Sequence, residues 1–408
     1  SNLAQLLHAT NRPAEAEPLM RRALAIDELS FGSDHPNIAI RLGNLALLFK
    51  ATDRLAEAEP LMRRALAIDE QSYGPEHPNV AIRLNSLGGL LYATNRLVEA
   101  ELLMRRALAI DEKSYGPTHS KVASSLSYLA ALQSKANHWA EAEPLIRRAL
   151  AIFERSLGEN HPKVASILNN LALLLLDTNR LVEAEPLMRR ALAIDEQSFG
   201  PDHPEVATVL SSLAQLLQAA KRLNEAEPLM RRALAIDEQS YGPEHPKVAN
   251  RSSNLGLLLY ATKRLNEAEP LMRRALAIDE QSYGPDHPNV AIRLNNLGGL
   301  LYATKRLTEA ELMMRRALAI DEKSYGPEHS NVAIRLNNLA RLLQATTRLT
   351  EAVPLMRAVL LIYAKLTAVT SHEHPHLQAA QENYRAILVK SGLTEEQAMQ
   401  RVRSAMQD

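Results

Sequence analysis

Apolar and polar positions repeat every 42 residues along almost the whole chain. In one row of this repeat, Leu294, Leu297 and Leu301 recur at the spacing of a single helical face. After a short polar loop, Ala310 and Met314 do the same. Each row therefore predicts two amphipathic helices. Neither helix can bury its apolar face alone, so the rows must stack, and we expect an all-α solenoid.

The rows align without a gap from residue 1 to about residue 366. We expect nine repeats over residues 1–368, the first of them truncated at its N-terminus. The register then slips, and residues 369–408 read as a degenerate pair of helices that caps the stack. Because the chain opens inside a repeat and without Met, we also expect it to be part of a longer protein.

The sequence carries signals for where the helices begin and end. Asn266 is followed three residues later by Glu269, which is the spacing of a capping box at the start of the second helix. Gly326 is placed to end the second helix of the following row. In the closing segment, Thr394 and Gln397 have the same capping-box spacing.

Charge and composition narrow the range of functions. Lys plus Arg and Asp plus Glu both number 47, and this balance argues against a dedicated nucleic-acid binder, which usually has a basic excess. The chain has no cysteine, which excludes disulfides and thiol chemistry and suits a reducing, cytoplasmic location. It has no apolar run of about 18 residues, so we expect no membrane-spanning helix.

A histidine recurs every 42 residues, and it raises the question of metal binding or catalysis. The series is His35, His77, His119, His161, His203, His245, His287 and His329. Helices stack about 8–10 Å apart, so histidines of successive rows are too far apart to share a zinc ion. We interpret each one as a loop residue that caps the next helix or packs on its neighbour.

Other chemistry has little support in the sequence. The cluster His372, His374 and His376 leaves adventitious metal binding open, but no further ligand beyond Glu373 completes a site. No Gly-x-Ser-x-Gly elbow and no glycine-rich phosphate loop occurs. We therefore expect no cofactor, no metal and no enzymatic activity.

Arginine pairs such as Arg315-Arg316 recur in most rows. Glu311 precedes Arg315 by four residues, the favourable order for an ion pair on a helix. We interpret these pairs as a solvated outer face, and a phosphate-binding stripe is the alternative.

The helix pair resembles the tetratricopeptide repeat. Its template positions are occupied by Leu294, Leu297, Gly298, Leu301, Ala310 and Met314. With a period of 42 and the motifs HPxVAxxLNNLAxLL and EAExLxRRALAI, the chain is similar to the kinesin light chain type of this repeat. The resemblance implies a right-handed superhelical solenoid whose concave groove binds extended protein segments.

Positions that vary between rows are not required for packing the helices of the stack. In the first helix, one varying face carries Asn295, Gly299 and Tyr302. The resemblance implies that this face lines the groove and that the first Asn of LNNLA contacts the peptide. The candidate groove residues are Asn85, Tyr92, Asn169, Gln218, Tyr260, Asn295, Tyr302, Asn337 and Arg341.

The leading hypothesis is a non-enzymatic interaction module that binds an extended protein segment, as in the sensor arm of a larger multidomain signalling protein. The alternative is a structural spacer or a scaffold that associates with copies of itself. The expected partner is a protein or peptide segment, not a nucleic acid or a membrane.

Overall fold

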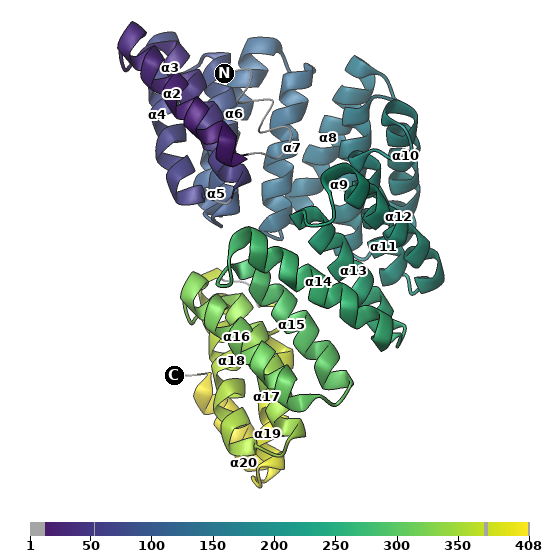
Figure 1. Cartoon of the computed structure of the whole chain (residues 1–408). Helices are drawn as coiled ribbons and strands as arrows, with labels where there is room; N and C mark the ends of the chain where they lie inside the picture. The colour runs from purple at the N-terminus through teal and green to yellow at the C-terminus, as the bar shows by residue number, and fades with distance from the viewer. Residues whose placement is uncertain (1–12, 53, 371–373, 407–408) are drawn as a thin grey trace. The chain divides into compact units, whose positions relative to one another are not determined.

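A computed structural model of the chain describes residues 13–52, 54–370 and 374–406. These residues form nineteen α-helices and no strand (Figure 1). The chain divides into two compact units, residues 1–222 and 223–408. Each unit is a stack of helix pairs, which confirms the all-α, helix-turn-helix architecture that the 42-residue pattern predicts.

The first helices of the pairs are 16 residues long. They are α3 (Pro36–Ala51), α5 (Pro78–Ala93), α7 (Ser120–Lys135), α9 (Pro162–Asp177), α11 (Pro204–Ala219), α13 (Pro246–Ala261), α15 (Pro288–Ala303) and α17 (Ser330–Ala345). The second helices are α2 (Pro13–Phe31), α4 (Leu55–Tyr73), α6 (Leu97–Tyr115), α8 (Trp139–Leu157), α10 (Leu181–Phe199), α12 (Leu223–Tyr241), α14 (Leu265–Tyr283), α16 (Leu307–Tyr325) and α18 (Leu349–Thr370). The chain closes with α19 (Leu377–Lys390) and α20 (Glu395–Ala405).

The recurring histidine is the N-cap of each first helix. His77 Nδ1 accepts a hydrogen bond from the backbone N–H of Asn79 at 3.2 Å, and its ring stacks on Tyr73 with centroids 4.8 Å apart. The same side-chain cap is present at all eight histidines of the series. Seven of the eight rings also stack on an aromatic residue at the end of the helix before. The histidine therefore caps the next helix and in these rows packs on its neighbour, as the sequence predicted.

The capping box predicted at the start of the second helices is wrong. In α14 the N-cap is Arg264, which makes no side-chain cap bond, and Asn266 already lies inside the helix. The loop residue Lys263 has a left-handed backbone with φ of 64°, and this sharp turn brings the helix start forward. Glu269 is occupied instead by ion pairs to two arginines.

The end signals and the closing segment follow the sequence more closely. Gly326 ends α16 with a φ of 83°, a conformation that glycine adopts at low cost. Thr394 and Gln397 form the predicted capping box at the start of α20. The helix α19 packs against α18, and α20 packs against both. Because α18 runs on to Thr370, the boundary placed at residue 368 falls inside a helix, and the capping role stays a prediction.

The histidine cluster of the closing segment is partly described. His374 repeats the local arrangement of the series, because its Nδ1 accepts from the N–H of His376 at 3.2 Å and its ring stacks on Tyr363 at 4.5 Å. His372 lies outside the described residues. In the part of the chain that the structure describes, no three His, Asp or Glu side chains gather as metal ligands would.

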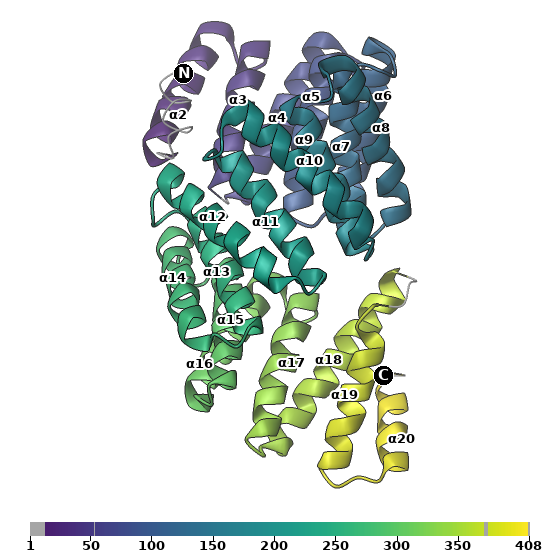
Figure 2. The ribbon, with the colours of Figure 1, turned by 90° about the vertical axis from the view of Figure 1, so that its right-hand side faces the viewer.

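The constant Leu and Ala positions form the core of each unit. Ala58 and Ala100 of the second helices and Leu87 of a first helix are fully buried, and so is Leu297 in the C-terminal unit. Neighbouring first helices contact each other, as α5 and α7 do, whereas neighbouring second helices make no comparable contact among the described residues. The first helices therefore lie closer together than the second helices do, as expected for the inner side of a curved stack. Figure 2 shows the same helix pairs from a second side.

Candidate binding groove

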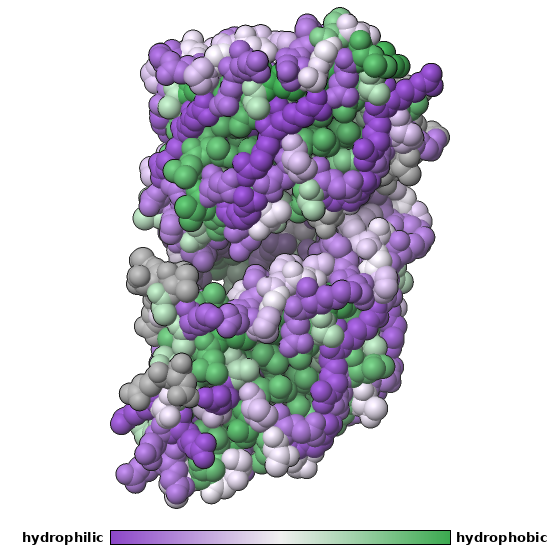
Figure 3. Space-filling model, turned by 90° about the vertical axis from the view of Figure 1, so that its left-hand side faces the viewer, coloured by the Kyte–Doolittle hydropathy of each residue, from purple (hydrophilic) through white to green (hydrophobic). Residues whose placement is uncertain are grey.

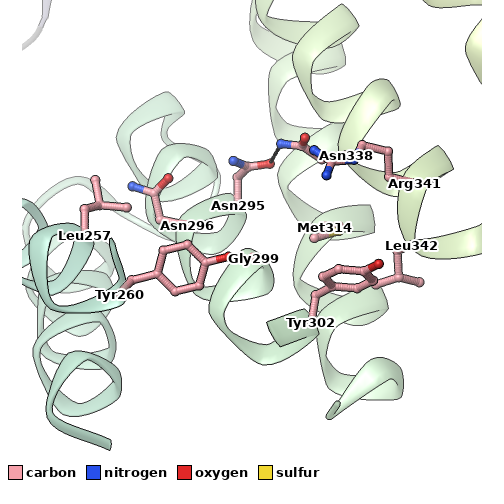
Figure 4. Close-up of a pocket in the computed structure, with 10 residues that line it drawn as sticks. All are labelled: Leu257, Tyr260, Asn295, Asn296, Gly299, Tyr302, Met314, Asn338, Arg341 and Leu342. Atoms are coloured by element: carbon pink, nitrogen blue, oxygen red, sulfur yellow. Dashed lines mark hydrogen bonds between the residues drawn. The ribbon is translucent and has the colours of Figure 1, made fainter. Parts of the chain in front are cut away.

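Four of the nine predicted groove residues line one cavity of the C-terminal unit, of about 210 Å³. We call it the tyrosine pocket, and it is lined by Leu257, Tyr260, Asn295, Asn296, Gly299, Tyr302, Met314, Asn338, Arg341 and Leu342 (Figure 4). Three successive first helices, α13, α15 and α17, supply most of these side chains. The varying face of the first helix thus borders a cavity, and its role in binding stays a prediction.

Amide side chains connect neighbouring first helices across this pocket. Asn338 Nδ2 on α17 donates to Asn295 Oδ1 on α15 at 2.9 Å (Figure 4). Asn296 Nδ2 donates in turn to Ser253 Oγ on α13 at 3.5 Å. The first Asn of LNNLA therefore faces the next row, and the second Asn faces the row before.

The second Asn was missed by the sequence analysis. Asn296 and Asn338 line the tyrosine pocket as fully as Asn295 does. A signal was available, because this position also varies between rows, with Ser86, Tyr128 and Ser212 in other repeats. It lies one residue, or about 100°, around the helix from Asn295, and both positions border the groove.

Polar groups of the pocket remain available for a ligand. Arg341 is exposed and makes no hydrogen bond or ion pair with another described residue. The phenol oxygens of Tyr260 and Tyr302 also have no partner among the described residues. Asn295 and Asn338 use one group each in their mutual bond, which leaves the Asn295 N–H groups and the Asn338 carbonyl able to bind a peptide backbone.

Two adjacent glycines of α15 have different structural roles. A Cβ added at Gly298 would lie 3.0 Å from Met314 Cγ, so this glycine allows close helix packing. A Cβ added at Gly299 would meet nothing within 4 Å. Glycine inside a helix costs about 1 kcal/mol relative to alanine. Packing does not require Gly299, and its lack of a side chain leaves space between the two tyrosines.

A related cavity of about 490 Å³ lies in the N-terminal unit, and we call it the lysine pocket. It is lined by Leu47, Lys50, Ile82, Asn85, Ser86, Gly89, Tyr92, Met104, Asp111, Lys121, Ser124, Ser125, Tyr128 and Ala131. Asn85 Nδ2 donates to Ser125 Oγ at 2.7 Å, and Ser125 Oγ donates to Asp111 Oδ2 at 2.6 Å. Burial lowers the pKa of Lys50 and raises the pKa of Asp111. The lysine pocket thus combines a chain of hydrogen bonds from Asn85 through Ser125 to Asp111 with a lysine on its wall.

Three predicted groove residues line neither pocket. Asn169 on α9 is buried, and its Oδ1 has no hydrogen-bond partner. Gln218 on α11 is half-buried. Asn337 on α17 accepts a hydrogen bond from Asn383 Nδ2 of α19 at 3.5 Å, so the closing segment reaches its side chain. For these three residues a role in binding stays a prediction.

Comparison with protein families decides what kind of repeat this is. A tetratricopeptide repeat model matches residues 1–71, 44–113, 103–155, 122–197, 164–239, 205–281, 249–323 and 294–365. The chain belongs to the tetratricopeptide repeat family. Tetratricopeptide repeats are a general protein–protein interaction module built on a non-catalytic scaffold, so the family expected from the sequence is confirmed. A search of curated proteins found no match.

Several solved structures are similar to this tetratricopeptide repeat chain. A putative kinesin light chain of Podosopora anserina with nearly identical TPR-like repeats has 25% identity over 51% of this chain and 98% of that chain, with a TM-score of 0.45. Rap protein complexed with competence and sporulation factor has 14% identity over 90% of this chain and 99% of that one, with a TM-score of 0.54. A signal transduction ATPase with numerous domains and a tetratricopeptide repeat sensor, from Pyrococcus horikoshii, has 14% identity, coverage of 90% and 52%, and a TM-score of 0.56. The last two likenesses show the fold.

Buried or partly buried ion pairs connect five of the tetratricopeptide repeats to the next near the inner side. Asp279 at the end of α14 accepts from Arg293 Nε on α15 at 2.7 Å, and both side chains are almost fully buried. The equivalent pairs are Asp27–Arg41, Asp69–Arg83, Asp237–Arg251 and Asp321–Arg335. Burial raises the pKa of Asp279, and Arg293 opposes that rise.

Three rows depart from this pairing. In the row that ends with α8, both members are apolar, with Phe153 and Ile167 in the two positions. Ser125 replaces the arginine opposite Asp111. Opposite Asp195 stands Val209, so this buried carboxyl has lost its arginine. Its pKa is raised to about 6, first by burial and then by the carboxylate of Glu205.

The outer face is a network of ion pairs. Arg315 bonds Glu311 on its own helix at 2.8 Å and Glu351 of the next repeat at 3.4 Å. Each side chain of these pairs is partly exposed, so the network agrees with the solvated outer face that the sequence predicted. No helix in the described residues is both long enough and apolar enough to cross a membrane. On the face drawn in Figure 3, apolar residues form patches bordered by hydrophilic ones.

Proposed function

We propose that this tetratricopeptide repeat chain binds an extended protein segment along the inner side of its first helices, with the tyrosine pocket as the main contact. The supporting observation is the set of polar groups around Gly299, a position that packing does not require to be glycine. Two phenols and one guanidinium have no partner among the described residues, and the two amides that bond each other each keep a second group free. Repeats of this family generally bind protein or peptide partners, and the chemistry of the pocket suits that class of ligand.

Each group has a distinct task in this proposal. An N–H of Asn295 donates to a backbone carbonyl of the segment, and the carbonyl of Asn338 accepts a backbone N–H. These bonds hold an extended chain without reading its side chains. Tyr260 and Tyr302 enclose one side chain of the segment, as aromatic residues commonly do at interfaces. Arg341 supplies a charge-assisted hydrogen bond to an acceptor of the segment.

The experiment selects ligands for the pocket directly. A phage-displayed library of random 16-residue peptides is selected on the intact chain, and the recovered peptides are tested on the variant Gly299→Leu. Leu173 and Leu257 occupy this position in other repeats, so the variant should fold and fill the cavity. Arg315→Ala, on the outer face, is the matched control. We expect the peptides to lose binding to Gly299→Leu and keep it on Arg315→Ala.

The opposite pattern would place the ligand elsewhere. If the peptides bind Gly299→Leu as well as the unchanged chain but lose binding to Arg315→Ala, recognition takes place on the outer face. If selection yields no peptide and sedimentation shows concentration-dependent association of the pure chain, the self-associating scaffold is the better description. Cytoplasmic localisation belongs to the same proposal, and fluorescence of the tagged parent protein tests it.

A further inference from the structure

In six repeats, the second arginine of the Arg-Arg pair ties its helix to the loop of the preceding repeat. Arg316 Nη2 donates to the backbone carbonyl of Pro285 at 3.0 Å, and Nη1 pairs with Glu280 at 2.5 Å. We call this arrangement the arginine clamp. It is formed by Arg64, Arg106, Arg148, Arg190, Arg274 and Arg316. Each clamp satisfies one loop carbonyl and one carboxylate with a single guanidinium.

The last repeat lacks the guanidinium but keeps both of its acceptors. Ala358 on α18 stands where the preceding repeats have arginine. The carbonyl of Pro327 and the carboxylate of Glu322 are the acceptors at this place, and neither accepts a side-chain hydrogen bond from the described residues. Lys365 still pairs with Glu328, an ion pair that recurs at the same place in other rows. The loop and α18 therefore keep the register of the other repeats.

Loss of the arginine coincides with a cavity. A hollow of about 650 Å³ opens beside Ala358, and Pro327, Leu361 and Ile362 contribute to its walls. The end of α20 supplies a further wall through Met406. Glu328 and Lys365, which form an ion pair with each other, also line the hollow. Its aliphatic walls suit the methylene groups of a long cationic side chain, whose charged head then reaches polar acceptors.

We propose that this hollow binds an arginine side chain of a partner protein. The inserted guanidinium donates to the Pro327 carbonyl and to the Glu322 carboxylate, and so completes the clamp that the other repeats make internally. Arginine fits better than lysine, because the two acceptors differ in kind and position and a planar guanidinium reaches both at once. Glu322 holds the place that Glu280 has in the clamp of Arg316, so it supplies a carboxylate at the position where the clamp needs one.

The test uses small probes and the intact chain. N-acetyl-arginine amide is titrated into protein with ¹³C-labelled isoleucine methyl groups, and the Ile362 signal reports on the hollow. N-acetyl-citrulline amide, which has the same shape but no charge, is the matched probe. We expect a saturable shift of Ile362 with the arginine probe and a shift at least tenfold weaker in affinity with citrulline, as loss of a charge-assisted hydrogen bond implies.

Two variants separate this site from general surface binding. Ala358→Arg places the clamp residue of six other repeats into the hollow and should abolish the response of Ile362. Glu322→Gln should weaken the arginine probe about tenfold, whereas Glu280→Gln, where Arg316 already occupies the clamp, should leave it unchanged. Equal binding of arginine and citrulline, or an unchanged titration in Ala358→Arg or in Glu322→Gln, would overturn the proposal.

Discussion

Replacing Asp195 by Asn should stabilise the N-terminal unit at neutral pH. Asp195 is 4% exposed, and Val209 stands where most repeats place an arginine. The carboxylate is therefore buried without a guanidinium, and Glu205 adds a second negative charge nearby. Asparagine keeps the shape of the side chain and removes the charge, so the variant tests the cost of that charge alone.

The size of the effect follows from the pKa. A rise from 3.8 to about 6 means that the folded state holds the proton more tightly than the unfolded state does. At about 1.4 kcal/mol for each tenfold change in proton affinity, the ionised Asp195 costs roughly 3 kcal/mol of folding free energy. Burial of the asparagine amide offsets part of the gain, so we expect a net stabilisation of about 1–2 kcal/mol at pH 7.5.

The sign of the pH dependence is fixed by the same shift. Because the folded pKa lies above the unfolded one, the penalty is complete above about pH 6 and fades as the pH falls toward 3.8. The advantage of Asp195→Asn over the wild type should therefore be large at pH 7.5 and nearly absent at pH 4. Other carboxylates titrate in both proteins, and the difference between them isolates Asp195.

Asp279→Asn in the C-terminal unit is the matched control. It makes the same change at the equivalent position, but it leaves Arg293 buried without its partner. Breaking one side of a buried ion pair typically costs about 3–5 kcal/mol, so this variant should be strongly destabilised. The two variants are thus expected to move in opposite directions at pH 7.5.

The assay combines urea unfolding at the two pH values with hydrogen exchange read by mass spectrometry. Repeat proteins can unfold in parts, so local protection of α10 and α11 is the more direct measure for Asp195, as protection of α14 and α15 is for Asp279. If Asp195→Asn lowers protection at pH 7.5 as Asp279→Asn does, the carboxylate has a stabilising partner and the reasoning is wrong. An equal gain at pH 7.5 and pH 4 would also refute it.

Three further predictions concern the pocket, the helix and the closing segment. Tyr302→Ala should weaken a selected peptide by about 2 kcal/mol or more in a binding titration, with the melting temperature unchanged and Arg315→Ala without effect. Gly299→Ala should raise the urea midpoint by an amount equivalent to about 1 kcal/mol, and Gly298→Ala should gain less because Met314 must move. Deletion of residues 374–408 should expose apolar residues of α18 and cause aggregation in size-exclusion chromatography, and a soluble, equally stable product would contradict the capping role.

Much of the fold was predictable from the sequence because the 42-residue pattern is both local and repeated. The spacing of Leu294, Leu297 and Leu301 defines an apolar face, and its recurrence shows what the face packs against. The histidine role was predictable for a related reason: a cap depends on the two residues that follow it. The start of the second helices could not be predicted in this way. It depends on the left-handed turn at Lys263 and its equivalents, which no pattern of side chains indicates.

The site was less predictable because its residues depend on neighbours from other rows. The same Asn position is half-buried at Asn295, buried at Asn169, and contacted by α19 at Asn337. The position within the row is identical, and the difference comes from the helices on either side. Asn383 stands 46 residues from its partner and outside the regular register, so row alignment could not place it there.

The departures from the repeat follow a physical rule. Where both members of a pair change, as in Phe153 and Ile167, the polar groups disappear together and no acceptor remains unsatisfied. Where only the arginine changes and an apolar residue replaces it, an acceptor is left behind, whereas Ser125 still donates to Asp111. The surroundings of the acceptor then decide the consequence. Asp195 is buried, so the loss of its partner appears as a raised pKa and a cost in stability. Glu322 is exposed, so its charge stays solvated, and the loss of its arginine leaves a hollow beside Ala358 that we propose a partner fills. One type of substitution therefore predicts instability on the inner side of the stack and recognition on the outer side.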